Sequence, residues 1–155
     1  MGRSLVRLGL GACLAGLAGL VAPQGAVAGP SCPQATLAPV PERTLTALIN
    51  RRRAKAGIAP VAKAAPLVRA GRRKSLSMAR GAPFEHTADL PWAGAAAAGQ
   101  NLAYAGSARE ALVAMLRSPA HRRNLLHREW RRAGVGAARD CDGMLYFTVN
   151  LIAPR

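Results

Sequence analysis

The periodicity of the chain changes from helical to strand-like towards its C-terminal end. Residues 131–139 (RRAGVGAAR) and 143–153 (GMLYFTVNLIA) are rich in strand-forming residues, and the Asp142-Gly143 pair between them is typical of a hairpin turn. In earlier segments, apolar residues recur with the spacing of helices. Helices followed by a hairpin predict an α+β domain, in which the helices pack on a small antiparallel sheet.

Start and stop signals predict two helices in the first half of the chain. The first begins at Pro41, which suits a first helical turn, and ends at Gly57. The second covers about residues 66–80. Residues 81–99 have the composition of a long loop, which in a compact domain is often functional. A short strand is predicted at 100–105.

A third helix is predicted at residues 107–118 from its capping box, in which Ser107 is the N-cap and Glu110 is the N3 residue. Pro119 ends this helix, because a proline cannot continue the hydrogen-bond ladder of the preceding turn. Residues 120–126 are predicted to form one or two further helical turns.

The first 28 residues have the pattern of a secretory signal peptide. Arg3 and Arg7 form a positive n-region, residues 8–22 form an apolar h-region, and residues 26–28 (AVA) form a small-x-small cleavage site. The apolar run is short for a membrane-spanning helix, which needs about 20 residues. A retained N-terminal anchor and a lipoprotein attached through Cys13 are the alternatives.

Cleavage after residue 28 leaves an extended Pro-rich lead-in at 29–40 and one domain at 41–155. Two cysteines remain, Cys32 and Cys141. Export favours a disulfide between them, because oxidising compartments allow it. Two free thiols are the alternative.

Charge is the strongest signal in the composition. Cleavage removes Arg3 and Arg7 from the 22 basic residues, so the exported chain has 20 basic and 7 acidic residues and a net charge of +13. Such a field attracts polyanions, and we expect anionic cell-envelope polymers, acidic polysaccharide or anionic lipid headgroups as partners. Export and only six aromatic residues argue against nucleic acid. A general bias towards arginine and alanine is the alternative explanation.

The chain has three histidines, and their spacing matches no common metal or hydrolase motif. His121 and His127 are six residues apart, which puts them on different faces of a helix. His86 and His121 are 35 residues apart, so only the fold could bring them together. Taken alone, each is more often a structural histidine than a ligand. His127 beside Glu129 is most simply a solvated surface pair.

Six short motifs follow one another along the chain: LTALINRRRAKAGIAPV, FEHT, GQNLAY, SPAHRRNLL, GVG and YFTVNLIA. In this order and spacing they resemble the bacterial branch of the CAP superfamily. These are SCP-like extracellular proteins related to cysteine-rich secretory proteins, antigen 5 and plant pathogenesis-related proteins. The resemblance covers residues 42–153. It implies a three-layer α–β–α sandwich with a central cleft lined by histidines and acidic residues, which in several members resembles a divalent-metal site.

The motifs of the family place His86, His121 and Asn101 in this cleft. The second acidic position of the cleft, in members that have one, corresponds to Ser118. Glu110 is the only acid on the predicted third helix, and the capping box explains it better than a place in the cleft.

Gln100 stands where the family has a glutamate. Zinc is generally held by imidazole, thiolate and carboxylate, whereas a glutamine offers only a neutral carbonyl oxygen. The resemblance therefore implies weak binding of zinc or copper by His86 and His121, with water completing the coordination sphere. Such a site is poorly suited to activating a catalytic water.

These observations predict a secreted, non-enzymatic binding module of the cell envelope or extracellular space. Its arginine-rich faces are expected at residues 51–53, 69–74 and 122–132. The alternative is a cleft hydrolase for peptide or cell-wall substrates, with His86 or His121 as general base. Binding of an apolar ligand or lipid between helices, as some relatives of the family are said to show, is a third possibility.

Overall fold

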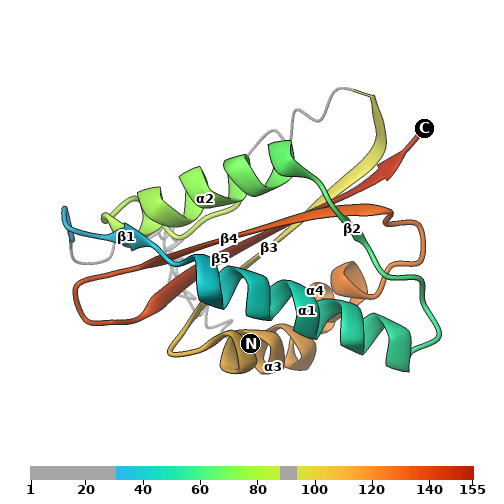
Figure 1. The fold of residues 1–155 in the computed structure, drawn as a ribbon, viewed down its shortest axis with the longest axis horizontal. Coiled ribbons are helices and arrows are strands. Elements are labelled where there is room, and N and C mark those ends of the chain that lie inside the picture. Colours follow the sequence, from blue (N-terminus) through green and yellow to red (C-terminus); the bar gives the residue numbers. More distant parts are fainter. Residues whose placement is uncertain (1–30, 88–93) are drawn as a thin grey trace, which may run out of the picture.

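A five-stranded sheet lies between two layers of helices (Figure 1). The computed structural model describes residues 31–87 and 94–155, so the predicted signal peptide lies outside the described residues. The strands are β1 (Thr36–Leu37), β2 (Ala62–Lys63), β3 (Ala95–Ala105), β4 (Arg132–Arg139) and β5 (Leu145–Pro154). The helices are α1 (Pro39–Lys55), α2 (Ala65–Ala79), α3 (Ala108–Arg117) and α4 (Pro119–Leu125). The predicted α+β class is confirmed.

The β4–β5 hairpin forms the centre of the sheet. The strand order is β1-β4-β5-β3, with β2 beside β4, so β3 is an edge strand of this sheet. All pairings are antiparallel except that of β2 with β4. At the turn, the carboxylate of Asp140 accepts hydrogen bonds from the backbone N–H groups of Asp142 and Met144, and Gly143 has a φ of +81°. The predicted hairpin is confirmed.

Helix α2 packs on one face of the sheet at backbone distance. A Cβ added to Gly136 would lie 2.0 Å from the carbonyl carbon of Gly71, and one added to Gly134 would lie 2.2 Å from the backbone of α2. Hydroxyl groups complete this contact, because Ser75 Oγ lies 3.1 Å from the Gly136 carbonyl oxygen and 2.9 Å from Thr148 Oγ1. Glycine in β4 therefore sets how closely α2 approaches.

The other face of the sheet is covered by α1, α3 and α4 (Figure 1) and holds the main apolar core. The strands contribute alternate residues to it, as expected for side chains that point to one face. Its most deeply buried members include Leu45, Ile49, Met115, Phe147 and Val149. The two faces of the sheet thus use different kinds of contact.

Arg53 is fully buried near the end of α1. Its guanidinium donates to the carbonyl oxygens of Ala59, Leu125 and His127, at 2.9, 2.8 and 3.0 Å. These bonds fasten α1 to the segment between α4 and β4. Of the arginine-rich face predicted at residues 51–53, Arg53 is therefore not available at the surface.

Two element boundaries and one additional strand differ from the sequence prediction. α1 begins at Pro39 rather than Pro41, because the first helical residues need no N–H donor and tolerate both prolines. β2 was not predicted. The alanines of residues 95–98 belong to β3 rather than to a loop, because pairing with β5 overrides the weak strand preference of alanine.

The predicted disulfide between Cys32 and Cys141 is confirmed, with a Cα–Cα distance of 5.7 Å. It joins the N-terminal lead-in to the turn between β4 and β5. No helix within the described ranges, 31–87 and 94–155, is long and apolar enough to cross a membrane.

Candidate functional site

The fold brings His86 and His121 together at the edge of β3. His86 lies in the loop after α2, His121 lies in the first turns of α4, and their ring centroids are 6.4 Å apart. His127 does not join them, since its ring packs on Trp130 and accepts a hydrogen bond from the backbone N–H of Glu129. Two of the three histidines therefore form one cluster.

Gln100 orients His86 through an amide oxygen. The backbone N–H of Thr87 donates to Gln100 Oε1 at 3.0 Å, which identifies this atom as the oxygen. His86 Nδ1 lies 3.2 Å from the same oxygen, which can only accept, so Nδ1 carries the proton. In the neutral ring, the lone pair of His86 is consequently on Nε2.

The amide nitrogen of Gln100 is also engaged. It donates to Asn150 Oδ1 at 2.9 Å, and Asn150 in turn donates to the carbonyl oxygen of Leu67 in α2. Asn150 is fully buried. It was not among the predicted site residues, because an asparagine within an apolar strand gave no pattern that linked it to the histidines.

Asn101, the next residue along β3, holds α4 in place. Its side-chain nitrogen donates to the carbonyl oxygen of His121 at 2.9 Å, and its oxygen accepts from Asn124 at 2.8 Å. A Cβ on Gly99 would lie 2.4 Å from Asn124 Oδ1 and 3.0 Å from the ring of Trp130. Within the GQN motif, Gly99 thus leaves room for Asn124, Gln100 orients His86 and Asn101 positions His121.

Ser118 and Glu110 both act at helix ends. Ser118 is the N-cap of α4 and accepts from the backbone N–H of His121 at 3.5 Å, so it lies next to the cluster. Glu110 lies in the first turn of α3, where its backbone N–H donates to Ser107 and its carboxylate accepts from the backbone N–H of Gly106. The predicted capping role of Ser107 and Glu110 is confirmed.

Electrostatics favour a neutral His121. Its partial burial, and then the proximity of His86, lower the pKa of its imidazole. No cluster of three or more His, Cys, Asp or Glu suited to a metal ion occurs within residues 31–87 and 94–155. The ligands that the cluster offers a divalent cation are therefore the two imidazoles.

A recess of about 330 Å³ opens beside His121. Sequence reasoning included Phe84 and Tyr104 in the family motifs FEHT and GQNLAY but assigned no recess to these aromatic residues. Phe84 and Tyr104 are half-exposed, and both rings pack against Tyr146. The lining consists of Phe84, Leu102, Ala103, Tyr104, Ala114, Met115 and His121.

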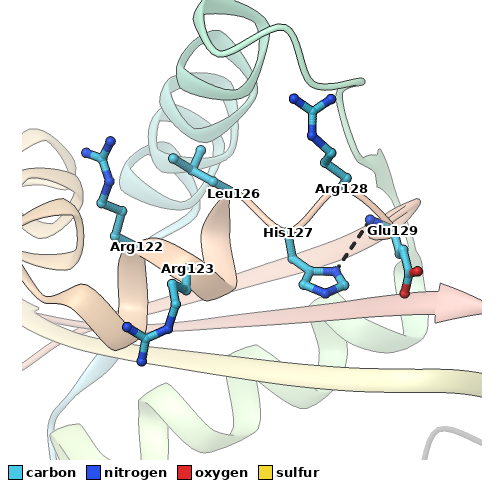
Figure 2. Close-up of a pocket in the computed structure, with 6 residues that line it drawn as sticks. All are labelled: Arg122, Arg123, Leu126, His127, Arg128 and Glu129. Carbon is cyan, nitrogen blue, oxygen red and sulfur yellow. Dashed lines mark hydrogen bonds between the residues drawn. The ribbon is translucent and has the colours of Figure 1, made fainter.

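A larger recess, of about 540 Å³, lies away from this cluster at the end of α4. Figure 2 shows its residues: Arg122, Arg123, Leu126, His127, Arg128 and Glu129. The three guanidinium groups point apart instead of towards one centre, and the Glu129 carboxylate lies on the side of the recess away from Arg122 and Arg123. This recess belongs to the arginine-rich face that was predicted at residues 122–132.

Comparison with known proteins gives one family. Residues 46–151 match the family described as CAP, the cysteine-rich secretory protein family. No curated protein sequence matches significantly.

Several solved structures share the fold. An outer surface protein of Borrelia burgdorferi has a TM-score of 0.68 at 15% identity, with 75% of this chain and 94% of that protein covered. An extracellular protein of Bacillus anthracis that contains a SCP domain has a TM-score of 0.62 at 24% identity, covering 74% of this chain and 40% of that one. A cysteine-rich secretory protein of Staphylococcus aureus has a TM-score of 0.58 at 19% identity, covering 74% and 39%. The chain thus spans about two fifths of the latter two proteins.

Proposed function

Because the chain belongs to the CAP family of cysteine-rich secretory proteins, we propose that it is an exported, non-enzymatic binding module. In this proposal it attaches to anionic polymers or anionic lipid of the cell envelope or extracellular space. The signal-peptide pattern of residues 1–28 supports export. So do the similar folds of an outer surface protein and an extracellular protein.

The observation that carries the proposal is the excess of unpaired surface cations. Arg72 and the buried Glu42 form the only ion pair between side chains in the described parts of the chain, with N–O distances of 2.7 and 3.0 Å. The other exposed arginines and lysines have no acidic partner there. Most of them lie on the four helices and on the segment that leads into β4. Such an uncompensated field favours a polyanionic partner.

Salt-dependent binding tests this proposal. The purified protein is titrated with dextran sulfate and with uncharged dextran, and with vesicles of phosphatidylglycerol and of phosphatidylcholine. We expect binding to the anionic member of each pair. Raising the ionic strength from about 0.01 M to about 1 M shortens the Debye length from about 30 Å to about 3 Å and should abolish that binding. Binding that is unchanged by salt, or equal for charged and uncharged probes, contradicts the proposal.

The cleft supports a binding role over a hydrolytic one. Gln100 places a neutral amide beside His86, and the amide is fully committed to Thr87, Asn150 and the imidazole itself. A general base in this cleft would have no carboxylate from this network to orient it. Peptide or cell-wall hydrolysis that disappears in both His86→Ala and His121→Ala would reverse this conclusion.

A second role, weak binding of zinc or copper, is favoured by the orientation of His86. Histidine ligands usually donate their other ring N–H to an oxygen acceptor, as His86 Nδ1 does to Gln100 Oε1. His86 and His121 would hold the ion, which would act as a weakly held Lewis acid completed by water. Gln100 would orient a ligand instead of serving as one.

Metal titration by calorimetry tests this second role. We expect His86→Ala to abolish binding of zinc and copper, and Gln100→Glu to tighten it by about tenfold, because a carboxylate acceptor raises the basicity of the imidazole. Binding by the parent that persists in both His86→Ala and His121→Ala would place the metal elsewhere.

A further inference from the structure

A groove between α1 and α3 gathers four cationic side chains. Its volume is about 300 Å³, and no acidic residue lines it. Arginines and a lysine form its walls, and two leucines provide its apolar part. The lining residues are Leu48, Arg51, Arg52, Lys55, Arg109 and Leu112.

One of these cations has an unsatisfied donor. The Nε atom of Arg52 is buried and has no hydrogen-bond partner among the described residues. Buried donors in folded proteins are nearly always paired, because leaving one unpaired loses the hydrogen bonds that water would supply. Arg52 therefore has an N–H group without an acceptor among the described residues, and a bound anion that turned this side chain into the groove would satisfy it.

Of the four cations in the groove, Arg109 has the position that most strongly indicates a bound anion. Arg52 and Lys55 lie in the last turn of α1, where the helix dipole favours positive charge. Arg109 lies in the first turn of α3, where the dipole disfavours it, and it also faces a groove that already holds three cations. A bound anion would attract all four cations and so offset their mutual repulsion.

We propose that the α1–α3 groove is a binding site for a phosphate ester group. A guanidinium presents a planar fork of donors that matches the oxygens of a phosphate, and arginine keeps its charge under all ordinary conditions. The leucines would contact the carbon atoms next to the phosphate. The site deepens the proposed function by giving the anionic partner a chemical class and a place on the protein.

The experiment compares two double variants with equal loss of charge. Arg52→Gln/Arg109→Gln removes two cations from the groove, whereas Arg122→Gln/Arg123→Gln removes two from the recess at α4. The probes are inorganic phosphate, glycerol phosphate, and vesicles of phosphatidylglycerol mixed with phosphatidylcholine. We expect the groove variant to bind inorganic phosphate and glycerol phosphate at least about tenfold more weakly, a change of about 1.4 kcal/mol, and the α4 variant to bind these two small probes like the parent.

Two single variants guard against a general loss of structure. Arg52→Lys keeps the charge but removes the buried Nε–H, so phosphate affinity should fall several-fold while dextran sulfate binding is unchanged. Arg109→Gln should weaken phosphate binding and at the same time raise the melting temperature of the free protein, because it relieves repulsion. A folding defect would instead lower both the phosphate affinity and the melting temperature.

The outcomes separate this site from the general proposal. If both double variants lose phosphate and vesicle binding equally, the whole surface field is responsible and the groove site is wrong, while the proposed function stands. If the parent binds no anionic probe, both are wrong. If the groove variant loses binding of inorganic phosphate and glycerol phosphate but still binds the vesicles, the site takes soluble phosphate esters. If it loses vesicle binding as well, the site also takes lipid headgroups.

Discussion

The two faces of the sheet are stabilised by different kinds of interaction. On the α2 face, glycines bring backbone against backbone, and hydroxyl and amide groups pair across the contact. On the opposite face, large apolar side chains fill the space under α1, α3 and α4. The first face depends on shape and on satisfied polar groups, and the second depends on buried volume. Adding or removing a single side-chain group should therefore change the stability of the protein most on the α2 face.

The largest effect is expected from adding one methyl group on the α2 face. Gly136→Ala would place a Cβ 2.0 Å from the backbone of Gly71, which no side-chain movement can relieve. We expect a loss of more than about 4 kcal/mol in the free energy of unfolding, measured by urea denaturation. Gly106→Ala is the control, since its Cβ would approach only the flexible end of Glu110. A Gly136→Ala protein as stable as the parent would show that α2 can move away from the sheet.

Removing volume from the opposite face should cost slightly less. Phe147 is fully buried in the main core, so Phe147→Ala is expected to destabilise the protein by about 3–5 kcal/mol. Phe147→Leu should recover much of this, because the core can repack around an apolar side chain of similar size. Equal losses for both substitutions would mean that this face also depends on exact shape.

The hydroxyl pair on the α2 face gives a smaller and non-additive effect. Ser75→Ala leaves the buried Thr148 hydroxyl without this partner and should cost about 1–3 kcal/mol. Adding Thr148→Val to Ser75→Ala should then restore part of the stability, because no unpaired hydroxyl remains. Urea denaturation of the two single variants and the double variant measures this coupling. Additive losses would contradict it.

The smallest effect is a pH dependence at the edge of β3, where the two faces meet. Burial and His86 hold the pKa of His121 below its ordinary value of 6.5 in the folded protein. As the pH falls, the unfolded chain therefore takes up this proton before the folded protein does. The stability that His121 contributes above pH 6.5 is consequently lost as the pH falls below 6.5.

Melting temperatures measured between about pH 7.5 and about pH 5, with a metal chelator present, test this pH dependence. The decline should be shallower in His121→Gln than in the parent. His127→Gln is the matched control, since it changes an exposed histidine that lies outside the cluster. A decline that is equally steep in His121→Gln would contradict the assignment.

The sequence supported the fold well where local signals and tertiary packing agree. The hairpin turn at Asp142-Gly143, the capping box at Ser107 and the break at Pro119 all have local causes, and the structure places them as predicted. The alanines that begin β3 have no such signal, and only β5 determines their conformation. Arg53 is similar, because its burial depends on carbonyl groups more than 70 residues away.

The candidate site could be predicted only in part. His86, Gln100 and His121 were identified through the resemblance to a family, not through spacing. Their arrangement depends on two buried amides, Asn101 and Asn150, and neither amide pairs with a sequence neighbour. Networks of this kind are set by the register of β3 on β5, which a single sequence does not show.

The disulfide between Cys32 and Cys141 has a mechanical consequence. It joins the beginning of the described chain to the turn that precedes β5, the last strand. A pulling force that enters the chain before residue 32 and leaves it after residue 154 would pass through the sulfur–sulfur bond directly into β5. The histidine cluster, the α1–α3 groove and four of the five strands would then lie within a covalent loop whose backbone is outside the direct path of this force. In a surface-tethered copy stretched by flow, tension would therefore act on β5 and would reach the histidine cluster only through noncovalent contacts such as that of Asn150 with Gln100.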